Sequence, residues 1–199
     1  MQQLFESWRK YLLSEAMKGP EDLPDGIYIG IRHRDSGTTE VYYSDYQGRM
    51  RRGEVWGLVR FGHRIGHGQS DCLGAWSVII SQAGRGWGPL LYDVAIELAG
   101  TDGLMADRES LSLKAYNVWL YYMNSRDDVV KKQLDDPNNT LTRNYEDNCE
   151  TDSAEERDGA EMGEEELINS PVMKVYTKGP TTIEKLQNMG KLLDRREKK

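Results

Sequence analysis

Three glycines at alternate positions, Gly84, Gly86 and Gly88, constrain this chain more than any other feature, because they lie between an apolar strand and an apolar helix. Residues 76–81 form a short apolar run, and residues 90–99 place their apolar side chains on one helical face. Glycine lets the backbone turn sharply and approach a ligand closely. The first amides of a helix lack internal partners and carry positive potential. The segment therefore predicts a phosphate or pyrophosphate site.

Two common nucleotide motifs do not fit this segment. The glycine spacing is not the dinucleotide fingerprint, and no Lys-Ser or Lys-Thr pair follows to make a P-loop. Pro89 suits the first turn of the helix, where its missing N–H costs little.

Alternating patterns predict the remaining elements. Residues 41–46 and 55–61 are expected to pair as antiparallel strands around Gln47-Gly48. Further expected strands are residues 27–33, 104–106 and 172–177, and expected helices are residues 3–17, 111–123 and 182–196, with a helical turn or two in 127–134. From residue 76 onward, strands and helices alternate, which indicates a partly parallel sheet covered by helices.

The glycine segment resembles motif A of the GNAT superfamily of acyl-CoA N-acyltransferases. Gly86 and Gly88 match the two glycine positions of that motif, while Ala83 stands where the family carries Arg or Gln. The resemblance covers mainly residues 55–125, with 172–177 as a plausible final strand. It implies an α/β (α+β) fold with a mixed, mostly antiparallel central sheet and helices on both faces.

The resemblance also implies a site. The pyrophosphate of acetyl-CoA or another acyl-CoA would lie on the glycine turn, and its pantetheine arm would run beside the strand at 76–81. The implied cofactor-binding residues are Ile80, Ser81, Gly84, Arg85, Gly86, Trp87, Gly88 and Leu90. The amine acceptor would approach from the other side of a gap between that strand and residues 104–106.

The catalytic residues carry over less directly. Many family members protonate the leaving thiolate with a Tyr four residues after the alanine that matches Ala115, and that position is Trp119 here. Tyr121 and Tyr122 are the candidates to replace it, with aromatic packing as their alternative reading. Ser112 stands where an Asn is usual in the family, and the sequence indicates no convincing general base.

The chain divides into four segments by composition. Residues 1–19 are an N-terminal amphipathic helix, 20–135 the GNAT-like core, and 171–199 the final strand and C-terminal helix of the same domain. Between them, residues 136–170 form an acidic insertion: residues 146–166 hold eleven acidic residues and one basic residue, so we expect this segment to be mobile. The N-terminal helix and the basic C-terminal tail are candidate surfaces for a protein partner or for homo-oligomerisation.

Charge and composition exclude several classes. A net charge of −7 makes nucleic-acid binding an unfavourable expectation. Two cysteines form no disulfide framework, no apolar run is long enough to span a bilayer, and no signal peptide is evident, so we expect a cytoplasmic protein (host cytoplasm or virion, if phage-encoded). His63 and His67 are spaced for a helical zinc site, but Gly66 and Gly68 argue against a helix, so we expect no metal.

Two functions remain open. The first is acyl-CoA-dependent transfer of an acetyl group to an amine of unknown identity. The alternative is a catalytically degenerate structural or interaction protein on the same fold, a phage virion component being one case. Ala83, Ser112 and Trp119, which depart from the family pattern, favour the alternative.

Overall fold

The computed structural model describes residues 17–63, 74–107, 111–134 and 169–195. The expected N-terminal helix, both cysteines and nearly all of the acidic insertion therefore lie outside the described residues. The strands are β1 (Tyr28–His33), β2 (Thr38–Ser44), β3 (Gly57–Gly62), β4 (Trp76–Ala83), β5 (Leu104–Met105), β6 (Val130–Gln133), β7 (Lys174–Thr177) and β8 (Leu192–Arg195). The helices are η1 (Pro20–Asp22), α2 (Gly88–Ala99), α3 (Leu113–Ser125), η3 (Pro171–Met173) and α6 (Thr181–Asn188).

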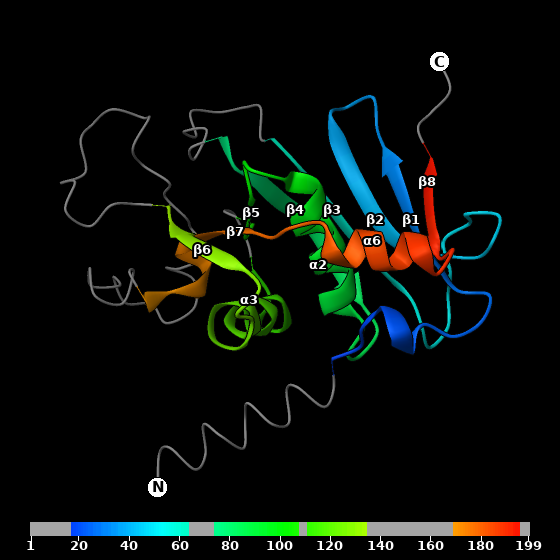
Figure 1. The fold of residues 1–199 in the computed structure, drawn as a ribbon. Coiled ribbons are helices and arrows are strands. Elements are labelled where there is room, and N and C mark those ends of the chain that lie inside the picture. The colour runs from blue at the N-terminus through cyan, green and yellow to red at the C-terminus, as the bar shows by residue number, and fades with distance from the viewer. Residues whose placement is uncertain (1–16, 64–73, 108–110, 135–168, 196–199) are drawn as a thin grey trace, which may run out of the picture.

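All eight strands form one open sheet in the order β6-β7-β5-β4-β3-β2-β1-β8 (Figure 1). The first four strands make an antiparallel meander. Only two neighbouring pairs are parallel, β4 with β5 and β1 with β8. The expected α+β class with a mixed, mostly antiparallel sheet is confirmed, as is the antiparallel pairing of the strands around Gln47-Gly48.

The main core lies between the sheet and α2. Val41, Val59 and Phe61 point to this side of the sheet and are fully buried together with Leu90, Leu91 and Val94 of α2. Helices α6 and α3 flank α2 on the same side (Figure 1). Ten of the twelve residues of α2 are buried, which explains why its sequence is apolar almost all round.

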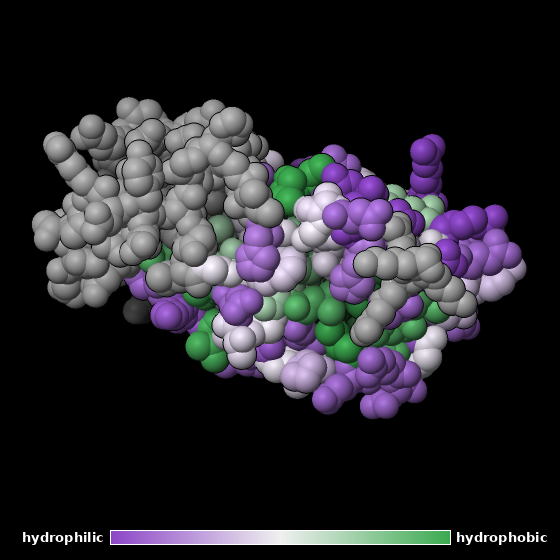
Figure 2. All heavy atoms as spheres, turned by 90° about the horizontal axis from the view of Figure 1, so that it is seen from above, coloured by the Kyte–Doolittle hydropathy of each residue, from purple (hydrophilic) through white to green (hydrophobic). Residues whose placement is uncertain are grey.

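The opposite face of the sheet is polar where β1, β2 and β3 adjoin. Glu40 is only 1% exposed there and pairs with Arg34 at 2.9 Å and Arg60 at 2.6 Å. Figure 2 shows hydrophilic residues over the end of the molecule formed by these outer strands, with hydrophobic residues gathered nearer its middle.

Two expected helical segments are corrected. Residues 130–133, expected within a helical turn or two, are strand β6, because they pair antiparallel with β7 and tertiary pairing overrides local preference. The C-terminal helix ends at Asn188 instead of continuing to residue 196. Gly190 has a φ of 65°, which ends the helix, and residues 192–195 then pair with β1 as an edge strand.

Candidate functional site

Strand β4 has one fully paired edge and one largely open edge. It pairs with β3 along its length, and the register shift there leaves Ile79 as an extra residue, a β-bulge. On its other side, β4 pairs with β5 only at Trp76 and Ser77. From residue 78 to residue 83, this edge therefore has no strand partner among the described residues, as β4 and β5 diverge.

The open edge leads directly into the glycine turn. A Cβ on Gly84 would lie 2.7 Å from the carbonyl oxygen of Glu54, so no other residue fits there without a shift of the backbone. The turn is closed by a hydrogen bond from the Trp87 amide to the Gly84 carbonyl oxygen at 3.1 Å. Gly86, with a φ of 81°, supplies the left-handed backbone that the turn needs.

Three amides around this turn have no partner among the described residues: those of Arg85, Gly86 and Gly88. Helix α2 begins without a side-chain cap, and its first turn holds no acidic residue. The positive end of the helix dipole is therefore not neutralised locally, and the arrangement can bind an anion.

The eight predicted cofactor residues separate into two groups. Ile80 and Arg85 are exposed, and Ser81, Gly84, Gly86 and Gly88 are partly exposed along the open edge and the turn. Trp87 and Leu90 are instead part of the core. The Trp87 ring packs edge-on against Tyr43, whose hydroxyl donates to the Trp87 carbonyl oxygen at 2.7 Å.

Both predicted catalytic tyrosines lie near Pro89, at the start of α2. Tyr122 is fully buried, and its hydroxyl lies 2.8 Å from the Pro89 carbonyl oxygen and 2.9 Å from Asp93 Oδ1. Burial, with the Asp93 carboxylate beside it, raises the pKa of Tyr122 well above its ordinary range. This hydroxyl joins α3 to α2 and is not free to protonate a leaving group.

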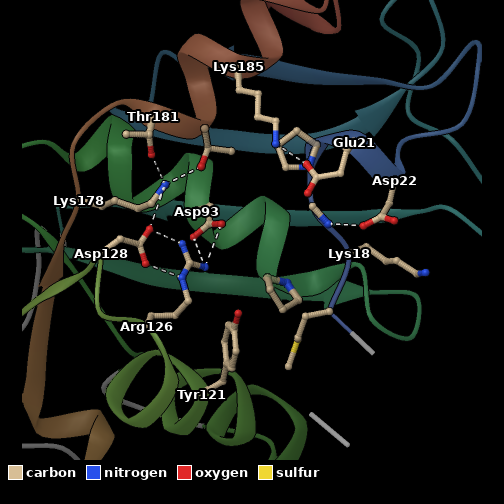
Figure 3. A pocket seen from close by; sticks show the side chains of 15 residues that line it. Lys18, Glu21, Asp22, Asp93, Tyr121, Arg126, Asp128, Lys178, Thr181 and Lys185 are labelled. Atoms are coloured by element: carbon tan, nitrogen blue, oxygen red, sulfur yellow. Dashed lines mark hydrogen bonds and ion pairs between the residues drawn. The ribbon is translucent and has the colours of Figure 1, made fainter. Parts of the chain in front are cut away.

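Tyr121 points into a polar cavity of about 350 Å³ that is enclosed by η1, α2, α3 and α6 (Figure 3). The cavity is lined by Met17, Lys18, Gly19, Pro20, Glu21, Asp22, Pro89, Asp93, Tyr121, Arg126, Asp128, Lys178, Thr181, Thr182 and Lys185. None of the eight predicted cofactor residues lines it. Pro89, which directly follows Gly88, lines the same cavity, and the amide of Lys18 donates to the Gly86 carbonyl oxygen at 3.0 Å, so the cavity adjoins the far side of the glycine turn.

A charged network fills one side of this cavity (Figure 3). Arg126 contacts Asp93 at 2.8 Å and holds both carboxylate oxygens of Asp128, at 2.7 and 2.8 Å. Burial raises the pKa of Asp93 even though Arg126 and Lys178 oppose this effect. Hydrogen bonding to Arg126 lowers the pKa of Asp128. Each charged group of this network has an oppositely charged partner within the protein, so the network stabilises the fold.

Two further buried residues were not predicted as site residues, although Trp119 was noted as standing where the family carries its catalytic tyrosine. Tyr92 of α2 and Trp119 of α3 are 2% and 0% exposed. The Trp119 indole nitrogen has no hydrogen-bond partner among the described residues, and the Tyr92 hydroxyl lies beside Ser81 without a well-formed hydrogen bond. An aromatic residue on an apolar helix face predicts core packing, and the structure shows both side chains in the core.

Comparisons with family models, with curated proteins and with solved structures find no match to this chain. None of the helices among the described residues has the length and apolar character needed to cross a membrane.

Proposed function

We propose that this protein is an acyl-CoA-dependent N-acyltransferase of the GNAT type, which binds its acyl-CoA along β4 and the glycine turn. One observation carries the proposal: the unpaired edge of β4 ends at a turn whose amides at Arg85, Gly86 and Gly88 have no partner among the described residues. An extended pantetheine arm can pair with a free strand edge, and a pyrophosphate can accept from free amides at a helix start.

The topology around the turn supports this proposal. The resemblance implies a gap between the strand before the glycines and the strand after the helix, and β4 and β5 are parallel neighbours that diverge after two residue pairs. The β-bulge at Ile79 lies on the same stretch of β4, and bulges are enriched beside active sites. The exposed Arg85 adds a positive charge next to the proposed diphosphate position.

The proposed chemistry is direct attack of a neutral amine on the thioester carbonyl carbon. The C–N bond forms, the C–S bond breaks, and the thiolate takes up the proton that the amine loses. Because the Tyr122 hydroxyl is committed to Pro89 and Asp93, and Tyr121 points into the charged cavity beside Arg126, the protein's contribution is orientation and electrostatic stabilisation.

A second candidate is a structural or interaction protein that keeps the fold without the reaction. It is favoured by the buried Trp119 at the position where the family carries its acidic tyrosine, and by the bonded state of the Tyr122 hydroxyl. This candidate predicts no loss of acetyl-CoA in the presence of any amine.

Calorimetry with acetyl-CoA tests the proposal. We expect micromolar binding, about −8 kcal/mol, and loss of binding in Gly86→Val, because a branched side chain disfavours the left-handed backbone that presents the amides. Gly37→Val is the matched control. Gly37 has a φ of 76°, with no atom within 4 Å of an added Cβ, and it lies in the turn between β1 and β2.

Gly88→Ala is a second control, expected to retain binding. A Cβ at Gly88 meets only Ala83 at 3.8 Å and Val118 at 3.9 Å, which are ordinary contacts. Wild-type protein that binds no acetyl-CoA at millimolar concentration contradicts the proposal. Turnover is measured as release of free thiol from acetyl-CoA over a panel of primary amines. Binding of acetyl-CoA without any such release favours the second candidate.

A further inference from the structure

Trp56 is an aromatic side chain that the fold leaves exposed beside the glycine turn. Its carbonyl oxygen accepts from the Gly84 amide at 3.0 Å, and a Cβ added to Gly84 would lie 3.3 Å from Trp56 Nε1. The side chain is nevertheless 37% exposed. Trp76, Trp87 and Trp119 each pack against another aromatic ring, whereas Trp56 contacts none among the described residues. Its indole therefore presents an open aromatic surface next to the turn.

Strand alternation places this ring on the side of the sheet away from α2. The next residue, Gly57, faces α2, because a Cβ there would lie 2.8 Å from Leu91 of that helix. Successive side chains of a strand point to opposite faces, so Trp56 points the other way. Gly84 and Gly86 are at most about 7 Å apart. A ligand held by the turn amides can therefore extend over the end of β4 and reach the ring.

Three exposed arginines lie in the two segments that meet at Trp56. Arg51 and Arg52 precede it, and Arg85 follows Gly84 in the turn. None of the three forms an ion pair among the described residues, whereas Arg49 is held by a carboxylate of its own turn at 2.7 Å. Glu54 is the single acidic residue between positions 46 and 56. The surface around Trp56 is therefore locally basic in an acidic chain, which favours an anion.

We propose that the Trp56 ring stacks on the adenine base of the bound acyl-CoA and that Arg51 and Arg52 bind its 3′-phosphate. An aromatic face binds a base by stacking, and a guanidinium group binds phosphate through paired N–H donors. The order of groups agrees with the ligand, since a ribose separates the diphosphate, on the turn amides, from the base.

This inference rests on the proposed function and specifies its acyl donor. Recognition through the nucleotide end means that the protein takes acyl groups from free acyl-CoA. A phosphopantetheine arm attached to a carrier protein has the same thioester but lacks the base and the 3′-phosphate, so it would leave Trp56, Arg51 and Arg52 unused.

The first test compares acetyl-CoA with S-acetyl-4′-phosphopantetheine, which keeps the thioester arm and one phosphate but lacks the adenosine. We expect calorimetry to show that the wild-type protein prefers acetyl-CoA by about 50-fold, the combined size of one stacked base and one bound phosphate. Trp56→Ala should weaken acetyl-CoA binding by about tenfold and leave the affinity for S-acetyl-4′-phosphopantetheine unchanged. Trp56→Phe, which keeps an aromatic face, should retain most of the preference.

The matched control is Tyr46→Ala, which removes a 68% exposed aromatic ring from the neighbouring turn and should change neither affinity. Tryptophan fluorescence gives a second readout, because a stacked adenine quenches indole emission. Quenching by acetyl-CoA should occur in the wild type and be lost in Trp56→Phe.

The arginines are tested with acetyl-dephospho-CoA, which lacks only the 3′-phosphate. We expect the wild-type protein to bind it about fivefold more weakly than acetyl-CoA. Combined Arg51→Gln and Arg52→Gln should abolish this difference, while Arg49→Gln, at an arginine that is already paired, should keep it.

Equal wild-type affinity for acetyl-CoA and S-acetyl-4′-phosphopantetheine overturns this inference alone, and so does an unaltered preference in Trp56→Ala. A preference for the 3′-phosphate that persists in the double arginine variant overturns the assignment of Arg51 and Arg52. Absence of binding for both thioesters overturns the proposed function and this inference with it.

Discussion

Tyr92 and Tyr122 are both fully buried and lie in the same aromatic cluster, with ring centroids 6.4 Å apart, but their hydroxyl groups differ in hydrogen bonding. The Tyr122 hydroxyl is within bonding distance of a carbonyl oxygen and of the Asp93 carboxylate, which Arg126 also contacts. The Tyr92 hydroxyl has no such partner among the described residues. Removing the Tyr122 oxygen therefore breaks hydrogen bonds, whereas removing the Tyr92 oxygen breaks no bond to a carbonyl or carboxylate oxygen.

We expect Tyr122→Phe to lower the free energy of unfolding by about 1–3 kcal/mol, because Asp93 loses a donor in a buried setting. Tyr92→Phe should change it by less than about 0.5 kcal/mol, because this hydroxyl has no carbonyl or carboxylate acceptor among the described residues and only an imperfect contact with Ser81. Urea denaturation of the two variants checks this. Equal losses in both would mean that the Tyr92 hydroxyl has a partner in solution.

At the scale of elements, α6 depends on a residue from another helix for its first turn. Its N-cap position is Pro180, which provides no side-chain cap. Glu97 of α2 accepts instead from the amides of Thr182 and Ile183, both at 2.7 Å, and pairs with the buried Lys178. One carboxylate thus caps α6, compensates a buried ammonium group and joins two helices.

Glu97→Ala should therefore destabilise the protein by about 3–5 kcal/mol, because it leaves the Lys178 ammonium, 2% exposed, without its close carboxylate. Adding Lys178→Met should recover part of this loss, since the uncompensated charge is then gone, while the missing cap still costs about 1 kcal/mol. A double-mutant cycle from chemical denaturation measures the coupling. Additive losses would show that the two side chains act independently.

At the scale of the whole molecule, Glu40 determines much of the expected response to acid. Burial acts to raise its pKa, but hydrogen bonds from Arg34 and Arg60 outweigh burial and hold the pKa below its ordinary value of 4.5. A carboxylate with a lowered pKa contributes stability above its unfolded pKa, and this contribution is lost as the pH falls through the folded value. Asp93, whose pKa is raised by burial, acts in the opposite direction.

We expect the urea midpoint to be nearly constant from about pH 7 to 5.5 and to fall below about pH 4.5. Glu40→Gln should lower stability by about 1–3 kcal/mol at neutral pH, because three arginines lose their shared carboxylate. Its difference from the wild type should shrink as the pH falls. Glu21→Gln, at an exposed pair with Lys185, should alter the profile little; a pH dependence unchanged in Glu40→Gln would contradict the assignment.

Most regular elements of this molecule were predictable because their side-chain periodicity is strong. The expected strands at 76–81 and 55–61, and the helix at 90–99, agree with β4, β3 and α2 to within two residues. Residues 130–133 were mistaken for a helical segment, because two lysines and a valine carry no clear alternation and only the pairing with β7 makes them a strand. The edge strand β8 was missed for a similar reason, since its partner β1 is distant in sequence.

The candidate site was predictable in its backbone but less so in its side chains. The glycines at 84 and 86 identified the turn, because a close approach to Glu54 and a positive φ both require glycine. The role of Tyr122 was not predictable, because its partners Pro89 and Asp93 lie on another helix. That the Trp119 indole nitrogen has no hydrogen-bond partner among the described residues also depends on side chains of other elements.

The sequence alone therefore determined the strand, turn and helix around the glycines, because backbone permissiveness and apolar periodicity are local properties of the chain. Only the tertiary structure decided that β4 and β5 diverge, that Glu97 caps α6 and that the Tyr122 hydroxyl bonds to Pro89 and Asp93. Each of these depends on distances between residues far apart in the chain. Those distances are set by packing of the whole core, which no local pattern encodes.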